Sequence, residues 1–268
     1  MMVDHKQIEC VIMDWAGTAV DFGCFAPVNA LIKAFAEIAI DLSTEEVREP
    51  MGVAKMEHIR RLLRMERICH AFKSAHHRNW NEEDVVTLNQ SFEKSLFATL
   101  TNYTDPLPHV IDTIALLRQK GIKIGSTTGY TRAMMDVVEP AARLKGYFVD
   151  NCITPDGLPM GRPAPFMIFK NMIDLNVQDI DRVIKVGDTM EDIREGLNAK
   201  AWTVGIIIGS SELGLSEAEV NAMPKTALNE RIAAVRRKMT DGGAHYVIDS
   251  LTELHDVVER INPLFSTT

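Results

Sequence analysis

The sequence predicts an α/β fold, with a Rossmann-like parallel sheet as the core and an inserted all-helical cap domain. Short apolar segments that end in small or polar residues alternate with segments of helical periodicity, which is typical of a parallel sheet with right-handed crossovers. One stretch, residues 22–104, holds several helical patterns and no convincing strand. The chain of 268 residues is long enough for one core and one inserted lobe.

Apolar segments rich in Val and Ile are expected to form buried parallel strands. They span residues 8–13, 122–125, 183–186 and 202–208. Residues 110–120 and 190–200 lie between them and carry apolar side chains at helical spacing, so helices are expected there.

The predicted cap domain spans residues 22–104, and the core domain comprises residues 1–21 and 105–268. A capping box begins at Ser43, and an apolar stripe runs from residue 85 to residue 100 after a candidate cap at Asn81. Since only two connections join the lobe to the core, the lobe could open and close over a bound molecule.

Composition excludes several classes of protein. Hydrophobic residues make up 46% and charged residues 25%, as in ordinary globular chains. The 29 Lys and Arg against 37 Asp and Glu give a net charge of −8, so no nucleic acid partner is expected. No apolar run approaches the roughly 18 residues of a membrane span, and no signal peptide is evident, so a cytoplasmic protein is expected. The four cysteines form no CxxC pair and are predicted to be free thiols.

Polar residues stand where predicted strands end, at Asp14, Thr128 and Asp188. Ligands of open parallel sheets bind beyond the carboxyl ends of the strands. Two converging carboxylates with Asp192 nearby would repel one another without a cation, and hard oxygen ligands suit Mg²⁺. Asp188 or Thr189 could instead only cap the following helix, but the joint occurrence of these residues favours a magnesium site.

Four segments resemble, in order and spacing, the motifs of the haloacid dehalogenase superfamily. They are residues 14–18 (DWAGT), residues 126–129 (STTG), Arg162 and residues 187–192 (GDTMED). The resemblance implies that a nucleophilic aspartate is phosphorylated with the help of Mg²⁺.

The resemblance also implies a role for each matching residue. Asp14 would be the nucleophile, and Asp14, the backbone carbonyl of Ala16 and Asp188 would hold Mg²⁺, with Asp192 supporting the metal shell. Thr128, Gly129 and Arg162 would bind the phosphoryl group, because backbone amides and a guanidinium suit its oxygens.

One position departs from most phosphatases of this superfamily. They carry a second aspartate two residues after the nucleophile, which protonates the leaving alkoxide, and this chain has Ala16 there. Either the phosphatase is weakened or inactive, or the leaving group needs no proton. Lys55 offers the second solution, because an iminium formed with an aldehyde withdraws electrons from the neighbouring carbon. His58, three residues on, shares a helix face with Lys55.

The wider set of motifs resembles the phosphonoacetaldehyde hydrolase family over residues 8–260. The additional matches are residues 24–27, residues 50–52 with Lys55, residues 125–130 and residues 209–214. This resemblance implies a Schiff base on Lys55, phosphoryl transfer to Asp14, and the products acetaldehyde and phosphate. It further implies the substrate phosphonoacetaldehyde, breakdown of 2-aminoethylphosphonate and a homodimer.

Four further residues near these motifs have both a functional and a packing interpretation. Met51 and Cys24 either line the pocket or pack in the core, and packing is favoured for Cys24. Tyr130 either covers the phosphate site or shields the sheet edge. His58 either relays protons during imine formation, which its position favours, or forms a hydrogen bond within the cap.

Two rival functions stay open at this point. A phosphomonoesterase or phosphosugar mutase on the same fold would need an acid in place of Ala16 and no cap amine. A non-catalytic phosphate-binding or assembly protein would lose no function when Asp14 is replaced by Asn.

Overall fold

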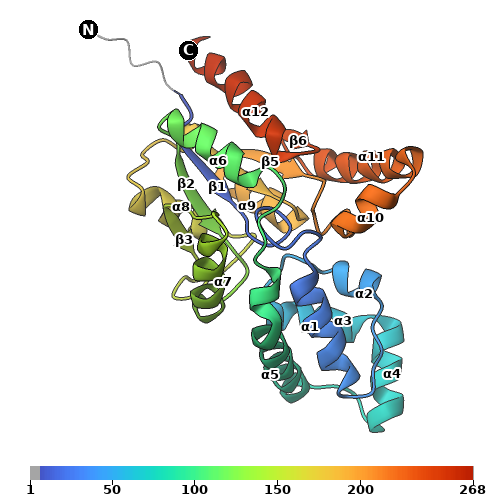
Figure 1. The fold of residues 1–268 in the computed structure, drawn as a ribbon. Coiled ribbons are helices and arrows are strands. Elements are labelled where there is room, and N and C mark those ends of the chain that lie inside the picture. Colours follow the sequence, from blue (N-terminus) through green and yellow to red (C-terminus); the bar gives the residue numbers. More distant parts are fainter. Residues whose placement is uncertain (1–6, 268) are drawn as a thin grey trace.

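A computed structural model describes residues 7–267 and contains a six-stranded parallel sheet (Figure 1). Its strand order is β3-β2-β1-β4-β5-β6. The strands are β1 (Cys10–Met13), β2 (Lys123–Thr127), β3 (Asn151–Ile153), β4 (Val183–Gly187), β5 (Trp202–Ile206) and β6 (Tyr246–Ile248). The predicted fold class, a Rossmann-like α/β core with a parallel sheet, is confirmed.

All four predicted strands are present, and the two edge strands β3 and β6 were not predicted. Each edge strand has only three residues and is partly exposed, so neither gives a long apolar run. Strand β2 also continues two residues further than predicted, because Ser126 pairs with Met13 and Thr127 pairs with Ile153.

Helices cover both faces of the sheet. The core helices and turns are α6 (Val110–Gln119), α7 (Arg132–Leu144), α8 (Phe166–Asp174), η2 (Ile180–Arg182), α9 (Met190–Ala199), α10 (Glu217–Ala222), α11 (Lys225–Asp241), η3 (Leu251–Glu253), α12 (Leu254–Ile261) and η4 (Asn262–Thr267). In β1, Val11 and Met13 belong to the apolar cluster that includes α6 and α12. Cys10 and Ile12 alternate with them and pack with Ile168 of α8. This alternation explains why the strand is apolar throughout.

Five of the six α-helices between β1 and β2 form a lobe beyond the carboxyl ends of the strands (Figure 1). They are α1 (Phe25–Ala36), α2 (Thr44–Arg48), α3 (Lys55–Arg64), α4 (Glu66–His76) and α5 (Glu82–Thr99), followed by the turn η1 (Leu100–Tyr103). The predicted caps at Ser43 and Asn81 are both present as capping boxes. We refer to this lobe as the cap; its predicted limits as a domain, residues 22 and 104, stay a prediction.

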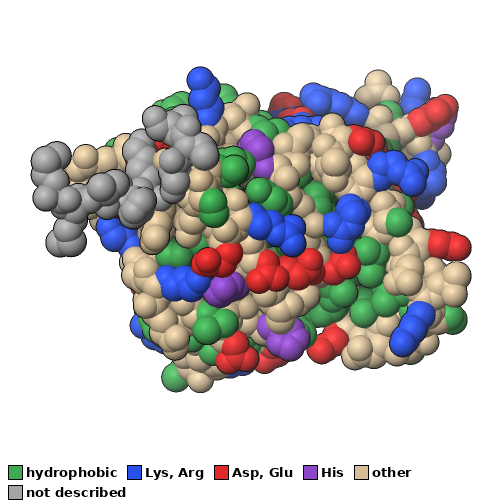
Figure 2. All heavy atoms as spheres, turned by 90° about the horizontal axis from the view of Figure 1, so that it is seen from above, with side chains coloured by type: hydrophobic (Ala, Val, Ile, Leu, Met, Phe, Trp, Pro, Cys, Tyr) green, Lys and Arg blue, Asp and Glu red, His purple; other side chains and the backbone are tan. Residues whose placement is uncertain are grey.

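The surface and the cysteines agree with an ordinary globular chain. Acidic and basic side chains are interspersed on the face shown in Figure 2. Within residues 7–267, every helix is too short or too polar to cross a membrane. All four cysteines are free, as predicted.

The strand order places the functional site. From β1 the chain proceeds to β2 and β3 on one side, and then returns to β4 on the other side of β1. Crossovers on opposite sides leave a crevice at the carboxyl ends of β1 and β4. Asp14 and Asp188 directly follow these two strands.

Substitution Phe92→Ala should destabilise the cap by about 3–5 kcal/mol, because removal of this buried ring of α5 leaves a cavity in the interior of the cap. Phe97→Ala in the same helix is the matched control, since that side chain is 39% exposed, and its cost should stay below about 1 kcal/mol. Urea unfolding of both variants measures the difference, and equal losses would contradict the assigned packing.

Candidate active site

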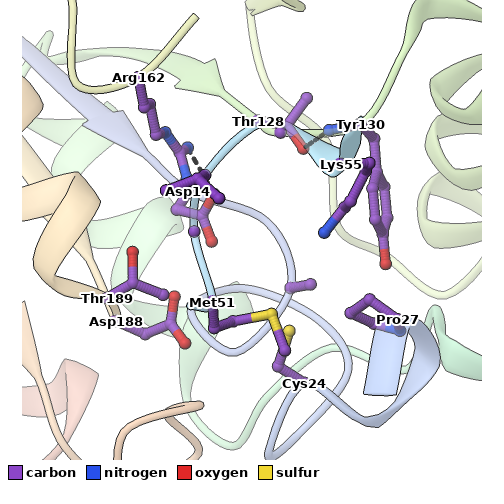
Figure 3. Close-up of a pocket in the computed structure, with 14 residues that line it drawn as sticks. Asp14, Cys24, Pro27, Met51, Lys55, Thr128, Tyr130, Arg162, Asp188 and Thr189 are labelled. Atoms are coloured by element: carbon purple, nitrogen blue, oxygen red, sulfur yellow. Dashed lines mark hydrogen bonds and ion pairs between the residues drawn. The ribbon is translucent and has the colours of Figure 1, made fainter. Parts of the chain in front are cut away.

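A pocket lies between the cap and the carboxyl ends of the strands (Figure 3). The residues that line it are Asp14, Ala16, Cys24, Pro27, Met51, Gly52, Val53, Lys55, Thr128, Gly129, Tyr130, Arg162, Asp188 and Thr189. Ten of them were candidates from the sequence. Two other candidates, His58 and Asp192, do not line the pocket. Sequence reasoning did not single out Pro27, Gly52, Val53 and Thr189 as site residues, although Pro27, Gly52 and Thr189 lie within the quoted motifs.

Asp14 occupies the base of the pocket at the end of β1. Its Oδ1 accepts a hydrogen bond from Nη2 of Arg162 at 2.5 Å, and Figure 3 shows its other carboxylate oxygen facing into the pocket. Burial raises the pKa of Asp14 above its ordinary value, although Arg162 opposes this rise. The next residue, Trp15, is buried, and its Nε1 donates to Oγ of Ser126 at 2.9 Å, which fixes the chain where it leaves the strand.

Arg162 connects Asp14 to the charges beneath it. Its Nη1 lies 2.9 Å from Oδ1 of Asp192, its Nε donates to Glu195 at 3.1 Å, and its Nη2 also donates to the carbonyl of Thr127 at 2.8 Å. Burial alone would lower the pKa of Arg162, but the three carboxylates raise it above its ordinary value. Arg162 therefore remains charged and fixed in orientation.

A second buried cation, Lys185 of β4, completes this network. Its Nζ lies 2.8 Å from Asp192 Oδ1 and 3.3 Å from Glu195 Oε2, and it donates to Oγ1 of Thr127 at 2.9 Å. Sequence reasoning missed Lys185 and Glu195. Two signals could have revealed them: a lone charge inside an apolar strand, and a carboxylate three residues after Asp192 on the same helix face.

Asp188 is held at the end of β4 by backbone and side-chain donors. Its Oδ2 accepts from the amide of Ser211 at 2.7 Å, and Thr18 Oγ1 lies 3.4 Å from its Oδ1. Burial, and then the charge of Asp14, raise the pKa of Asp188 well above its ordinary value. Thr189, and not Asp188, is the N-cap of α9, so the Asp188 carboxylate is available to the pocket.

The acidic residues fit a divalent cation. Oxygens of Asp14, Asp188 and Asp192 lie within 4.8 Å of one another, and all three side chains are buried. Asp192 is already engaged, because Arg162 and Lys185 contact its Oδ1 and Thr189 Oγ1 donates to its Oδ2 at 2.6 Å. These cations hold the pKa of Asp192 below its ordinary value despite burial. The arrangement favours direct ligation by Asp14 and Asp188 and a supporting role for Asp192.

The cap approaches the core closely at Gly52, next to Thr189 and Glu191. A Cβ at that position would lie 2.8 Å from Oγ1 of Thr189 and 3.0 Å from Cβ of Glu191, and its φ is +96°. A side chain there would be strained and would push the cap away from the core. Gly52 thus permits the close contact that places the following residues over the pocket.

Lys55 enters the pocket from the opposite side, as the first residue of α3. Figure 3 shows its amine directed into the pocket beside Tyr130 and across from Asp14. Its Nζ lies 5.9 Å from the centre of the Phe92 ring. Burial lowers the pKa of Lys55, and Arg162 contributes in the same direction, whereas Cys24 and Asp14 oppose it. A lowered pKa increases the fraction of neutral, nucleophilic amine.

His58 lies behind the pocket lining. Its ring is fully buried, and its Nε2 is 2.8 Å from the carbonyl oxygen of Val47. Burial, and next the charge of Lys55, lower the pKa of His58 to about 3, so the ring is neutral. With neutral Nε2 donating to the carbonyl, Nδ1 is left as an acceptor, and it has no partner within residues 7–267. The predicted relay role stays a prediction.

The remaining candidates surround the space between Asp14 and Lys55. Oγ1 of Thr128 accepts from the backbone amide of Tyr130 at 3.1 Å, which orders the turn after β2. The Tyr130 side chain is buried, and burial raises its pKa well above the ordinary value, so the phenol stays neutral. Cys24 and Met51 lie together in Figure 3, and both line the pocket.

Comparisons with known proteins identify the family. The family of haloacid dehalogenase-like hydrolases matches residues 8–200. A phosphonoacetaldehyde hydrolase of Bacteroides fragilis is 56% identical over 257 residues, covering 96% of this chain and 98% of the relative. A phosphonoacetaldehyde hydrolase of Bacillus cereus is 47% identical and covers 95% of this chain and 97% of its own length.

A solved structure gives the same result. The crystal structure of a phosphonoacetaldehyde hydrolase-like protein from Oleispira antarctica superposes with a TM-score of 0.95 at 35% identity, covering 98% of this chain and 95% of that one. The resemblance noted in the sequence is thereby confirmed. The chain belongs to the haloacid dehalogenase-like hydrolases and, among them, to the phosphonoacetaldehyde hydrolase family.

Proposed function

We propose that this protein hydrolyses phosphonoacetaldehyde to acetaldehyde and phosphate, using Lys55 as an amine catalyst and Asp14 as the phosphoryl acceptor. The observation that carries the proposal is their shared pocket: an amine with a lowered pKa faces a buried carboxylate, with Ala16 where an acid would otherwise stand. The names of the relatives supply the substrate.

The first step is condensation. The neutral amine of Lys55 attacks the aldehyde carbon, and loss of water leaves an imine, which becomes an iminium on protonation. The side chains of Tyr130, Cys24 and Met51 line the pocket and exclude solvent from the imine. The phosphonate group then lies toward Thr128, Gly129 and Arg162, whose amide and guanidinium groups balance its negative charge.

The second step breaks the carbon–phosphorus bond. The free oxygen of Asp14 attacks phosphorus, and the electron pair of the broken bond moves into the iminium, which becomes a neutral enamine. Because the leaving carbon is an enamine and not an alkoxide, no acid is needed at Ala16. Water then hydrolyses the aspartyl-phosphate, while the enamine is protonated on carbon and a second water releases acetaldehyde from Lys55.

Charge balance supports Mg²⁺ as the cofactor. Four carboxylates are buried here, those of Asp14, Asp188, Asp192 and Glu195, and they carry four negative charges when ionised. Arg162 and Lys185 carry two positive charges, so two negative charges stay unbalanced. Asp14, the carbonyl of Ala16 and Asp188 would hold the ion, and Asp192 would support it. The cation would lower the repulsion between the Asp14 carboxylate and the phosphonate.

Two expectations from the family resemblance accompany this proposal, namely a homodimer and a cytoplasmic location. Sedimentation of the purified chain tests the first, and cell fractionation tests the second.

Substitution Lys55→Ala should abolish acetaldehyde and phosphate formation and remove the adduct that borohydride traps in the presence of substrate. Mass spectrometry of the digested protein locates the adduct. Lys73→Ala is the matched control, because Lys73 is an exposed lysine of the same cap, and it should retain both activity and adduct. Full turnover in the Lys55→Ala variant would refute the mechanism.

Substitution Asp14→Asn should separate the two steps. The variant retains the amine and should form the trapped adduct with phosphonoacetaldehyde, but its phosphate release should fall by at least about 1,000-fold, since the nucleophile is lost. Phosphate and adduct are measured in the same samples. Unchanged phosphate release would favour a non-catalytic role for Asp14, and release from generic phosphate esters by the wild-type protein would favour a phosphomonoesterase.

The trapping of acetaldehyde on Lys55 by cyanoborohydride should rise with pH, with a midpoint below the ordinary lysine value of 10.5, because burial lowers the pKa of this amine. The midpoint should fall further in Asp14→Asn, since removal of that carboxylate takes away a charge that raises the Lys55 pKa. Adduct yields from pH 6 to 11 give both midpoints, and a wild-type midpoint at or above 10.5 contradicts the proposed activation.

A further inference from the structure

Arg48 joins the cap to the core beside the pocket without lining it. It is the last residue of α2 and stands in the cap segment that leads to Lys55. Its Nη1 donates to the carbonyl oxygen of Ser211 at 3.2 Å and lies 3.3 Å from Oγ of the same residue. These two hydrogen bonds cross from cap to core.

Ser211 also contacts the acidic base of the pocket. Its backbone amide donates to Oδ2 of Asp188 at 2.7 Å, so one residue accepts from the cap and donates to the candidate metal ligand. The loop is shaped for this approach at Gly214, where a Cβ would lie 3.2 Å from Nε of Arg48 and φ is +68°. Any side chain at that position would therefore be strained and would crowd the guanidinium.

The cap side of Arg48 is equally well fixed. The guanidinium lies over the Phe25 ring, 4.8 Å from its centre, and the carbonyl of Arg48 accepts from the amide of Met51 at 3.1 Å. The neighbouring carbonyl of Val47 is bonded to the His58 ring. The segment from Val47 to His58, which includes Lys55, is thus tied together on the cap side of the contact.

The Arg48 guanidinium forms no direct ion pair within residues 7–267. No carboxylate of residues 7–267 lies within ion-pairing distance, and its Nε and Nη2 are buried without hydrogen-bond partners. Burial lowers the pKa of Arg48, with Cys24, Asp188 and Asp21 acting in the opposite direction. Opening of the cap would rehydrate the guanidinium, so its desolvation opposes the two hydrogen bonds that favour closure.

We propose that Arg48 is a positioning residue that holds the cap closed through Ser211 and thereby couples placement of the Lys55 amine to the orientation of the Asp188 carboxylate. The inference rests on the proposed function, because it assigns both ends of the contact to one reaction. It predicts that loss of the guanidinium impairs the step that needs both lobes and spares the chemistry of the amine alone.

The test compares Arg48→Gln and Arg48→Lys with the control Arg64→Gln, an exposed arginine of α3. We expect kcat/KM for phosphonoacetaldehyde to fall by roughly 100-fold in Arg48→Gln, chiefly through kcat, because the reacting groups lose their alignment. Arg48→Lys keeps the charge but not the planar fork and should be intermediate. Acetaldehyde trapping on Lys55 at pH 11, where the amine is largely neutral whether or not it is buried, should stay within about threefold of wild type in all three variants, since that step then needs only the amine.

A structural measurement shows whether Arg48 holds the cap closed or only stabilises the fold. Small-angle X-ray scattering with Mg²⁺ and orthovanadate should show a smaller radius of gyration than the apo protein for wild type and Arg64→Gln, and no such decrease for Arg48→Gln. Compaction of Arg48→Gln to the wild-type value, or a kcat/KM within threefold of wild type, would overturn the proposal. If wild type does not compact, closure itself is refuted.

Failure of the proposed function and failure of the Arg48 proposal give different results. Absence of a Lys55 adduct in wild type would refute the imine mechanism, while the scattering data would still decide whether Arg48 controls closure. Thermal unfolding of Arg48→Gln shows whether the variant is folded. If it is not, Arg48→Lys takes its place in both measurements, and full compaction together with a kcat/KM within threefold of wild type would overturn the proposal.

Discussion

The charge balance beneath Asp14 is the constraint on which the rest of the site depends. Four carboxylates lie in a region from which water is excluded, where unpaired charges are costly. Arg162 and Lys185 contact two of them together, and the guanidinium also reaches Asp14. Burial raises the pKa values of Asp14 and Asp188, and two cations cannot balance four ionised carboxylates. A divalent cation would supply the missing charge, so the base is built to be completed by a ligand.

The amine opposite is controlled by the same charges. The Asp14 carboxylate raises the pKa of Lys55, whereas Arg162 and burial lower it. Any group that neutralises Asp14 therefore also favours the neutral amine. The charge at the base of the pocket and the protonation of the cap amine are thus linked through one electrostatic field, with no conformational signal required.

The sequence was most informative where local patterns are strong. Apolar runs predicted the four inner strands, and a capping box at Ser43 and a cap at Asn81 predicted two helix starts. The edge strands β3 and β6 were missed because three partly exposed residues carry no periodic signal. The choice between Asp188 and Thr189 as helix cap also needed backbone geometry, since either side chain could serve.

The candidate site could be predicted from motifs, but the long-range contacts that support it could not. Lys185 and Glu195 both reach Thr127, and Arg48 reaches Ser211, across distances in sequence that only the folded chain closes. His58 shows the opposite case. Its helical spacing from Lys55 is correct, yet the ring is directed to a backbone carbonyl, because helix position fixes the face of a side chain and not its partner.

The buried Trp15 has a practical consequence. Its indole lies next to Asp14 in the chain, donates to Ser126, and packs edge-on against Tyr147 with ring centres 5.0 Å apart. An indole held this firmly one residue from Asp14 is an intrinsic fluorophore close to the pocket. The protein therefore carries its own optical probe of changes around Asp14, without any attached label.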